Sequence, residues 1–69
     1  MTVEMVPVDS SAVEAVGFEL GDLYVKYRDG GLYVYLAVPE WLHRDLVNAD
    51  SIGGFLNREI KPHYECRES

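Results

Sequence analysis

The fold is decided by residues 23–38, which read LYVKYRDGGLYVYLAV. Two runs rich in aromatic and β-branched residues flank Asp29-Gly30-Gly31, and this combination is typical of a β-hairpin. The loop is expected to have two central residues, either Asp29-Gly30 or Gly30-Gly31. An unbulged three-residue loop is rejected, because moving the pairing by one residue inverts every side chain and mixes apolar with polar positions.

The predicted register divides the hairpin into two faces. One face is apolar and is expected to contact the core: Leu23, Val25, Tyr27, Leu32, Val34 and Leu36. The other combines aromatic rings with bases: Tyr24, Lys26, Arg28, Tyr33 and Tyr35. That second pattern also fits an ordinary half-buried sheet face, in which lysine and arginine stems cover the rings, or a face that a helix covers.

The segments on either side extend this hairpin into a larger sheet followed by helices. Residues 12–20 read as a strand that ends in a Gly21-Asp22 turn, and residues 3–8 read as an edge strand or extended arm because Pro7 lacks a donor. Apolar stripes predict helices near residues 39–49 and 51–61, the second capped by Asp50-Ser51. Residues 63–69 read as a tail that packs Tyr64 back or adds a short edge strand.

The predicted fold class is α+β. We expect one domain over residues 1–69, a three- or four-stranded antiparallel β-meander packed on one face by two C-terminal helices. The expected core combines the apolar hairpin face with the two helical stripes: Leu23, Val25, Leu32, Val34, Leu36, Leu42, Leu46, Phe55 and Ile60.

Composition limits the classes of function. The chain has 69 residues and a net charge of −6, with five carboxylates and no base in its first twenty-five residues. This balance is unfavourable for extensive phosphate neutralisation, so it predicts a solubilising surface or an acidic module that binds a basic protein or mimics nucleic acid. No apolar run reaches the roughly 20 residues of a membrane span, and Cys66 is the sole cysteine, so we expect a reducing, cytoplasmic setting.

The chemistry of the side chains does not indicate an enzyme. His63, Glu65 and Cys66 are too few and too local for a zinc site, and Ser10 and Ser11 are expected to make turn hydrogen bonds. Gly53-Gly54 fits close helix packing better than an anion cradle, since no P-loop lysine follows. We predict no catalytic residue, no metal and no cofactor.

Tyr33 and Tyr35 form a Tyr-x-Tyr motif, and Ser51, Gly53 and Asn57 form a later Ser-x-Gly-x-x-x-Asn segment. In this order the two motifs resemble the hallmarks of the KTSC domain family, which is named for its occurrence at the C-terminus of some lysyl-tRNA synthetases and also occurs as small stand-alone bacterial proteins. The resemblance extends over roughly residues 5–65. Through the association with the synthetases, it implies RNA binding.

The aromatic and basic hairpin face supplies a candidate site for that function. Single-stranded RNA is commonly held by bases stacked on aromatic rings while basic side chains contact the phosphates. The expected nucleic-acid-binding residues are those of this face and three at its rim: Tyr24, Lys26, Arg28, Tyr33, Tyr35, Asn57, Arg58 and Lys61. The expected partner is single-stranded RNA or tRNA, and the alternative partner is a basic protein.

Overall fold

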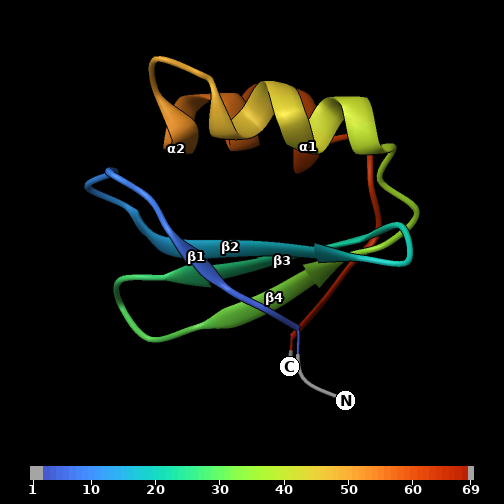
Figure 1. Ribbon diagram of the computed structural model, residues 1–69, viewed down its shortest axis with the longest axis horizontal. Coiled ribbons are helices and arrows are strands. Elements are labelled where there is room, and N and C mark those ends of the chain that lie inside the picture. The colour runs from blue at the N-terminus through green and yellow to red at the C-terminus, as the bar shows by residue number, and fades with distance from the viewer. Residues whose placement is uncertain (1–2, 69) are drawn as a thin grey trace.

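Residues 3–68, described by a computed structural model, form a β-sheet with a layer of helices on one face (Figure 1). Five antiparallel strands follow one another across the sheet in chain order: β1 (Val6–Pro7), β2 (Val13–Glu19), β3 (Asp22–Tyr27), β4 (Leu32–Tyr35) and β5 (Cys66–Glu68). The helical layer contains α1 (Glu40–Val47), α2 (Ile52–Phe55) and the π-helical turn η1 (Leu56–Ile60), which continues α2 directly.

The predicted α+β fold with two helical segments in the C-terminal half is confirmed. The strands added to the predicted meander are β1 and β5, which are short and lie at the two edges of the sheet. They form where the sequence predicts an edge strand or arm and a tail. The predicted domain also included residues 1, 2 and 69, which lie outside the described residues.

The prediction of a two-residue loop between β3 and β4 is wrong. Lys26 is opposite Leu32 in the register, and the amide of Tyr27 donates to the carbonyl of Gly31 at 2.8 Å, so the loop has three central residues. Gly30 N donates to Tyr27 O at 3.0 Å, and Gly30 has a φ of +106°. A turn followed by a left-handed glycine accommodates the third residue without distorting either strand.

This register reverses the predicted faces of β4. Tyr33 is opposite Val25 and Tyr35 is opposite Leu23, so both tyrosines face the helices. Leu32 and Val34 share the far face with Tyr24 and Lys26, and they are half-buried there. The prediction of Leu32, Val34 and Leu36 as core residues is therefore wrong.

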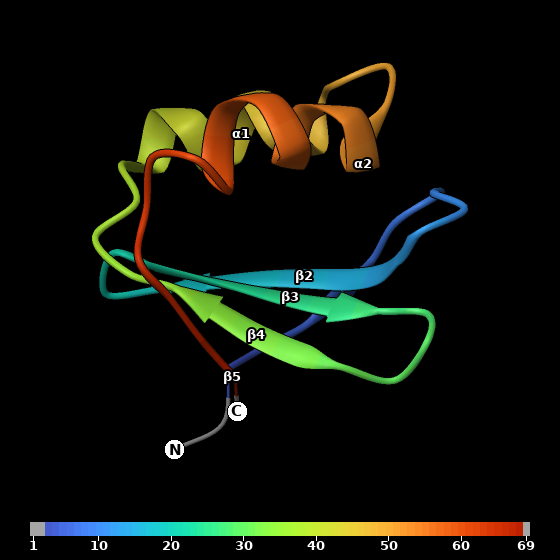
Figure 2. The same ribbon diagram turned by 180° about the vertical axis from the view of Figure 1, so that it is seen from behind.

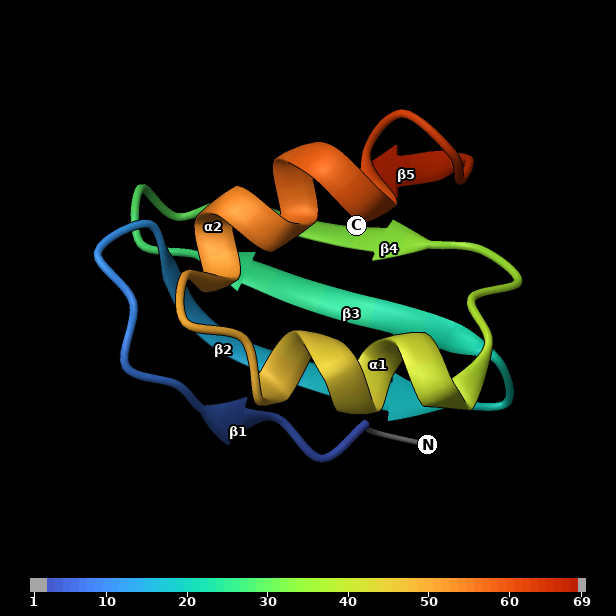
Figure 3. The same ribbon diagram turned by 90° about the horizontal axis from the view of Figure 1, so that it is seen from above.

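The core lies between the sheet and the helices. Five predicted members are buried: Leu23, Val25, Leu42, Leu46 and Ile60. Phe55 is partly buried against them. Further buried side chains complete the cluster: Val13, Val16, Tyr35, Val38, Ile52 and Leu56. Figure 3 shows α1 over the β2 side of the sheet and the α2–η1 segment toward β4.

The turn between β2 and β3 lies one residue earlier than predicted. Glu19 is opposite Asp22, so Leu20 and Gly21 are its central residues, with φ values of +53° and +83°. Leu20 is 91% exposed, although the sequence predicted it as the last residue of a strand. The carbonyl of Gly21 accepts a hydrogen bond from Val38 N at 2.7 Å, which fixes the connection into α1.

The N-terminal arm packs on the sheet face opposite the helices. A Cβ on Gly17 would lie 2.8 Å from the carbonyl oxygen of Glu4 and 2.8 Å from the sulfur of Met5. Glycine is therefore needed for the arm to approach the sheet this closely. At the other end, the chain leaves η1 and returns to the sheet edge as β5 (Figure 2). Within residues 3–68, no helix has the length and apolar character required to cross a membrane.

Candidate nucleotide-binding hollow

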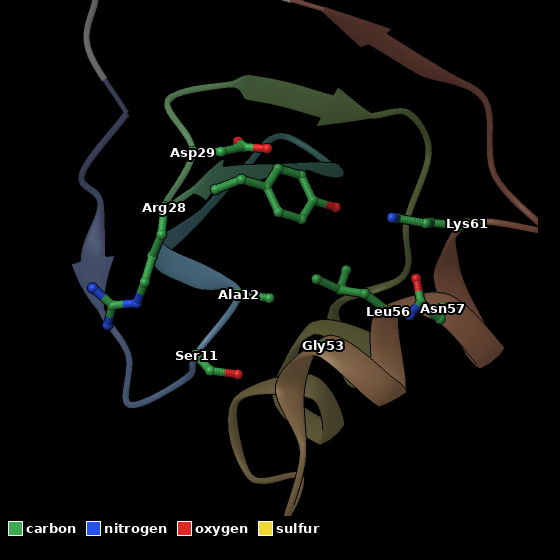
Figure 4. Close-up of a pocket in the computed structure, with 9 residues that line it drawn as sticks. Ser11, Ala12, Arg28, Asp29, Gly53, Leu56, Asn57 and Lys61 are labelled. Atoms are coloured by element: carbon green, nitrogen blue, oxygen red, sulfur yellow. The ribbon is translucent and has the colours of Figure 1, made fainter.

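A hollow of about 490 Å³ opens between the β3–β4 hairpin and the α2–η1 segment (Figure 4). We call it the hairpin hollow. It is lined by residues from the segment before β2, the hairpin and the second helical segment: Ser11, Ala12, Tyr27, Arg28, Asp29, Gly53, Leu56, Asn57 and Lys61. A second hollow of about 320 Å³ adjoins it, and we include both under this name. Tyr27, Asp29 and Lys61 line both hollows, and Tyr33 lines the second.

The aromatic wall of the hollow comes from the sheet face that the helices cover. Tyr27 is the last residue of β3, and its hydroxyl lies 2.9 Å from the hydroxyl of the buried Tyr35. The rings of Tyr27 and Tyr33 meet edge to face, with centroids 5.6 Å apart and an interplanar angle of 76°. The core thus anchors Tyr27 at its hydroxyl, while part of its ring lines the hollow.

The opposite wall is formed by a helical segment whose last turn is π-helical. Lys61 N donates to Leu56 O at 2.8 Å, five residues earlier in the chain. Leu56 and Ile60 are buried in this turn, and Leu56, Asn57 and Lys61 line the hollow. The Lys61 ammonium lies 5.3 Å from the centroid of the Tyr27 ring, within the range of a cation–π interaction.

The rim near the start of β2 is held by a serine turn. Ser10 Oγ accepts hydrogen bonds from the amides of Ala12 and Val13 at 3.3 and 3.2 Å, as expected for a turn serine. The carbonyl of Ser10 accepts a bond from Arg28 Nε at 2.6 Å. In Figure 4 the Arg28 guanidinium lies at the outer rim, whereas Lys61 points inward.

The hollow is lined by two basic side chains that, among the described residues, have no carboxylate close by. Lys26, Arg44 and Arg67 each have a carboxylate within 4.0 Å. Among residues 3–68, no carboxylate approaches the other three bases that closely: Arg28, Arg58 and Lys61. Arg28 and Lys61 line the hollow. Arg58 does not line it, and its guanidinium lies 3.2 Å from where a Cβ on Gly54 would be.

The pKa values of Tyr33 and Tyr35 are both raised, so these two tyrosines are protonated at neutral pH. Burial and the hydrogen bond with Tyr27 raise the pKa of Tyr35. The Glu68 carboxylate raises the pKa of Tyr33, with smaller contributions from burial and Asp29. Tyr33 therefore presents a neutral ring and a hydroxyl group that can donate a hydrogen bond. In residues 3–68, no group of three or more His, Cys, Asp or Glu side chains is arranged to hold a metal ion.

The structure brings together part of the predicted site and separates the rest. Arg28, Asn57 and Lys61 line the first hollow, and Tyr33 lines the adjoining one. Arg58 lines neither.

The prediction that Tyr24, Lys26, Arg28, Tyr33 and Tyr35 share one face of the hairpin is wrong. Tyr24 and Lys26 lie on the far face of the sheet, where Lys26 pairs with Glu14 at 3.9 Å. Tyr35 is 3% exposed, so its ring is unavailable for stacking.

Sequence reasoning missed Tyr27 and Asp29 as site residues. Tyr27 alternates with Leu23 and Val25, so it was assigned to the core, and only its place at the end of the strand hinted at exposure. Asp29 was interpreted as a turn residue. Its position beside Lys61 depends on how the helices pack, for which the sequence pattern gives no signal.

Known proteins resemble this chain over nearly all of its length. A sequence model of the KTSC domain matches residues 9–64. A protein from Tsukamurella paurometabola is 39% identical over 64 residues, which cover 90% of this chain and 96% of that protein. An uncharacterized protein from Stutzerimonas stutzeri is 39% identical over 62 residues, covering 86% and 87%.

A solved structure agrees with the fold as well. The crystal structure of a KTSC domain protein from Yersinia pestis superimposes with a TM-score of 0.92 at 33% sequence identity, and the match covers 99% of each chain. The Tyr-x-Tyr of this chain is at Tyr33 and Tyr35 in β4, and its Ser-x-Gly-x-x-x-Asn segment runs from the cap of α2 to the hollow. On the sequence match and the shared fold together, the chain belongs to the KTSC domain family.

Proposed function

We propose that this KTSC domain is a non-catalytic binding module that holds single-stranded RNA, or the single-stranded part of a tRNA, at the hairpin hollow. The observation that carries the proposal is that Arg28 and Lys61, two basic side chains with no carboxylate of residues 3–68 close by, line a hollow with a tyrosine wall in a chain whose net charge is −6. Phosphates contact basic side chains and bases stack on aromatic rings in RNA-binding sites of this kind.

The size of the hollow supports a short footprint. Lys61 and Arg28 are the two basic side chains that line it, so about two phosphates are neutralised. For a single strand this corresponds to a slope of about −1.4 in a plot of log affinity against log salt concentration. One base stacked on an exposed ring contributes about 1–3 kcal/mol. Binding is therefore weak for one domain and sensitive to salt.

A charge reversal with a matched control tests the proposal. Lys61→Glu places a carboxylate over the Tyr27 ring, and Lys26→Glu makes the same change in charge on the far face of the sheet. We expect fluorescence anisotropy with a labelled random single-stranded RNA at low ionic strength to show binding for the wild type and Lys26→Glu but not for Lys61→Glu. Equal losses in the two variants would show that total charge, and not the hollow, determines binding.

A second candidate function, binding of a basic protein, is supported by another groove. It lies between β1 and the end of α1 and is lined by apolar residues and two carboxylates: Val6, Pro7, Val8, Asp9, Val47, Ala49, Asp50 and Ile52. Val6 and Val47 are 55% and 39% exposed, and no base lines the groove. A lysine-rich peptide with apolar residues is expected to shift the NMR signals of Asp50 and Val47, and a glutamate-substituted peptide is not.

A cytoplasmic location is part of the same proposal. Cys66 is a free and exposed thiol, a state that a reducing compartment maintains. Measurement of the thiol with a maleimide reagent in intact cells tests this point, because a thiol in an oxidising compartment would be blocked.

A further inference from the structure

The part of the hollow nearest the hairpin has an unusual set of side chains for a phosphate site. Four residues line it: Tyr27, Asp29, Tyr33 and Lys61. Lys61 suits a phosphate and the tyrosines suit a base, but the Asp29 carboxylate would repel an anion. A ligand that fits all four groups must carry hydrogen-bond donors close to its phosphate.

The Asp29 carboxylate is largely free to accept such donors. Its Oδ1 accepts one long hydrogen bond from Gly31 N at 3.4 Å. Among the described residues, no lysine, arginine or histidine nitrogen lies within 4.0 Å of it. An ionised carboxylate accepts hydrogen bonds only, and its two oxygens can take two parallel donors at once.

The hairpin loop holds this carboxylate beside the rings. Gly30 takes a left-handed conformation, with a φ of +106°, which sets the length of the loop. A Cβ on Gly31 would lie 2.7 Å from Cε1 of Tyr33, so the ring packs directly over this glycine. Asp29 and Tyr33 are separated in the chain by Gly30, Gly31 and Leu32, and the conformation of the two glycines sets how the carboxylate lies relative to the ring.

We infer that the hairpin hollow prefers guanine, with the ring stacked against the tyrosine wall and the Asp29 carboxylate accepting from the base. Guanine is the one common base with two adjacent donors on its Watson–Crick edge, the ring N–H and the neighbouring amino group. Adenine and cytosine offer an amino donor beside an acceptor, and uracil offers one N–H between two carbonyls. Stacking is tolerant of sequence, so discrimination comes from Asp29.

This inference rests on the proposed function, and nucleotides that differ in single groups test it separately. The probes are the 5′-monophosphates of guanosine, inosine and adenosine, titrated into the ¹⁵N-labelled full chain and followed by NMR. Inosine keeps the ring N–H and lacks the amino group. We expect the guanosine compound to bind about tenfold more tightly than the adenosine compound, with inosine between them.

Two variants with the same change in charge identify the responsible residue. Asp29→Asn is expected to abolish the order of affinities, because an amide places a donor where guanine needs an acceptor. Asp45→Asn removes a carboxylate from the exposed side of α1, outside the hollow, and is expected to preserve the order. The amide spectrum of each variant reports whether the fold is intact.

Results that refute guanine preference can be distinguished from results that refute RNA binding. Equal binding of the three nucleotides, or an order of affinities unchanged by Asp29→Asn, refutes guanine preference even if RNA binds at the hollow. A uridine-rich RNA with one central guanosine, compared with the same RNA with adenosine there, distinguishes recognition within RNA from binding of the free nucleotide. If neither the nucleotides nor either RNA binds, both the inference and the proposed function are wrong.

Discussion

Leu20 occupies a backbone conformation that its side chain disfavours. It has a φ of +53° at the first central position of the β2–β3 turn, and Gly21 follows with a φ of +83°. A left-handed conformation costs an ordinary L-residue about 1–2 kcal/mol, whereas asparagine tolerates it and Asn-Gly is the preferred pair in such turns. Leu20 is 91% exposed, so its replacement removes little buried apolar area.

We therefore expect Leu20→Asn to raise the free energy of unfolding by about 1 kcal/mol. For a domain of this length, the gain corresponds to a rise of about 4–8 °C in Tm. Thermal and urea unfolding followed by circular dichroism measure both quantities. The control is Leu20→Ala, which shortens the side chain but leaves a Cβ in the left-handed conformation.

The alanine variant separates two explanations of a stability gain. If relief of the backbone is responsible, Leu20→Ala stays near the wild-type Tm while Leu20→Asn rises. If both variants gain equally, the benefit comes from removing an exposed leucine and the argument from φ is wrong. An unchanged Tm in Leu20→Asn would show that the turn relaxes around leucine without cost.

Three further predictions concern other parts of the fold. Burial lowers the pKa of His43, which stacks on Phe18, below 6.5, so the unfolded chain binds the proton more tightly than the folded one. The free energy of unfolding should therefore fall as the pH drops through about 6.5. Urea titrations of His43→Leu at the same pH values should show a smaller fall. Gly17→Val should displace the N-terminal arm, because a Cβ there would lie 2.8 Å from the carbonyl oxygen of Glu4, and should lower the free energy of unfolding by about 1–3 kcal/mol in denaturant titrations. Tyr27→Phe should cost about 1 kcal/mol by leaving the Tyr35 hydroxyl unpartnered, and a thermal melt of the variant with both tyrosines changed to phenylalanine should recover part of the loss.

The strand pattern predicted the hairpin but could not decide its faces. In β4, Leu32 and Val34 occupy one parity and Tyr33 and Tyr35 the other, and either pair is suitable for a core. The choice depends on one residue of loop length, which is set by the left-handed Gly30. Two adjacent glycines in the sequence leave that length open, whereas the helical stripes with Leu42 and Leu46 allowed one packing and were predicted correctly.

The candidate site was predictable only in its chemistry. Aromatic and basic residues were recognised around the hairpin, and Asn57 and Lys61 were placed near it. Their approach to Tyr27 depends on the π-helical turn and on the packing of the α2–η1 segment over the sheet, which are tertiary effects. Periodicity within one segment carries no information about such contacts.

The position of β5 has a consequence for the order in which the protein folds. β4 and β5 pair directly, yet the whole helical layer lies between them in the chain, and the pairing continues into Leu36 N, which donates to Glu65 O at 2.8 Å. Strands β2 to β4 can join through local turns, whereas β5 must wait until residues 36–65 have condensed over the sheet, because closing so long a loop earlier costs entropy without contacts to offset it. We therefore expect β5 to pair with β4 late in folding and to separate from it early in unfolding. In native-state hydrogen exchange, its amides should lose protection before those shared by β2 and β3, and each opening should release the helical layer at one end.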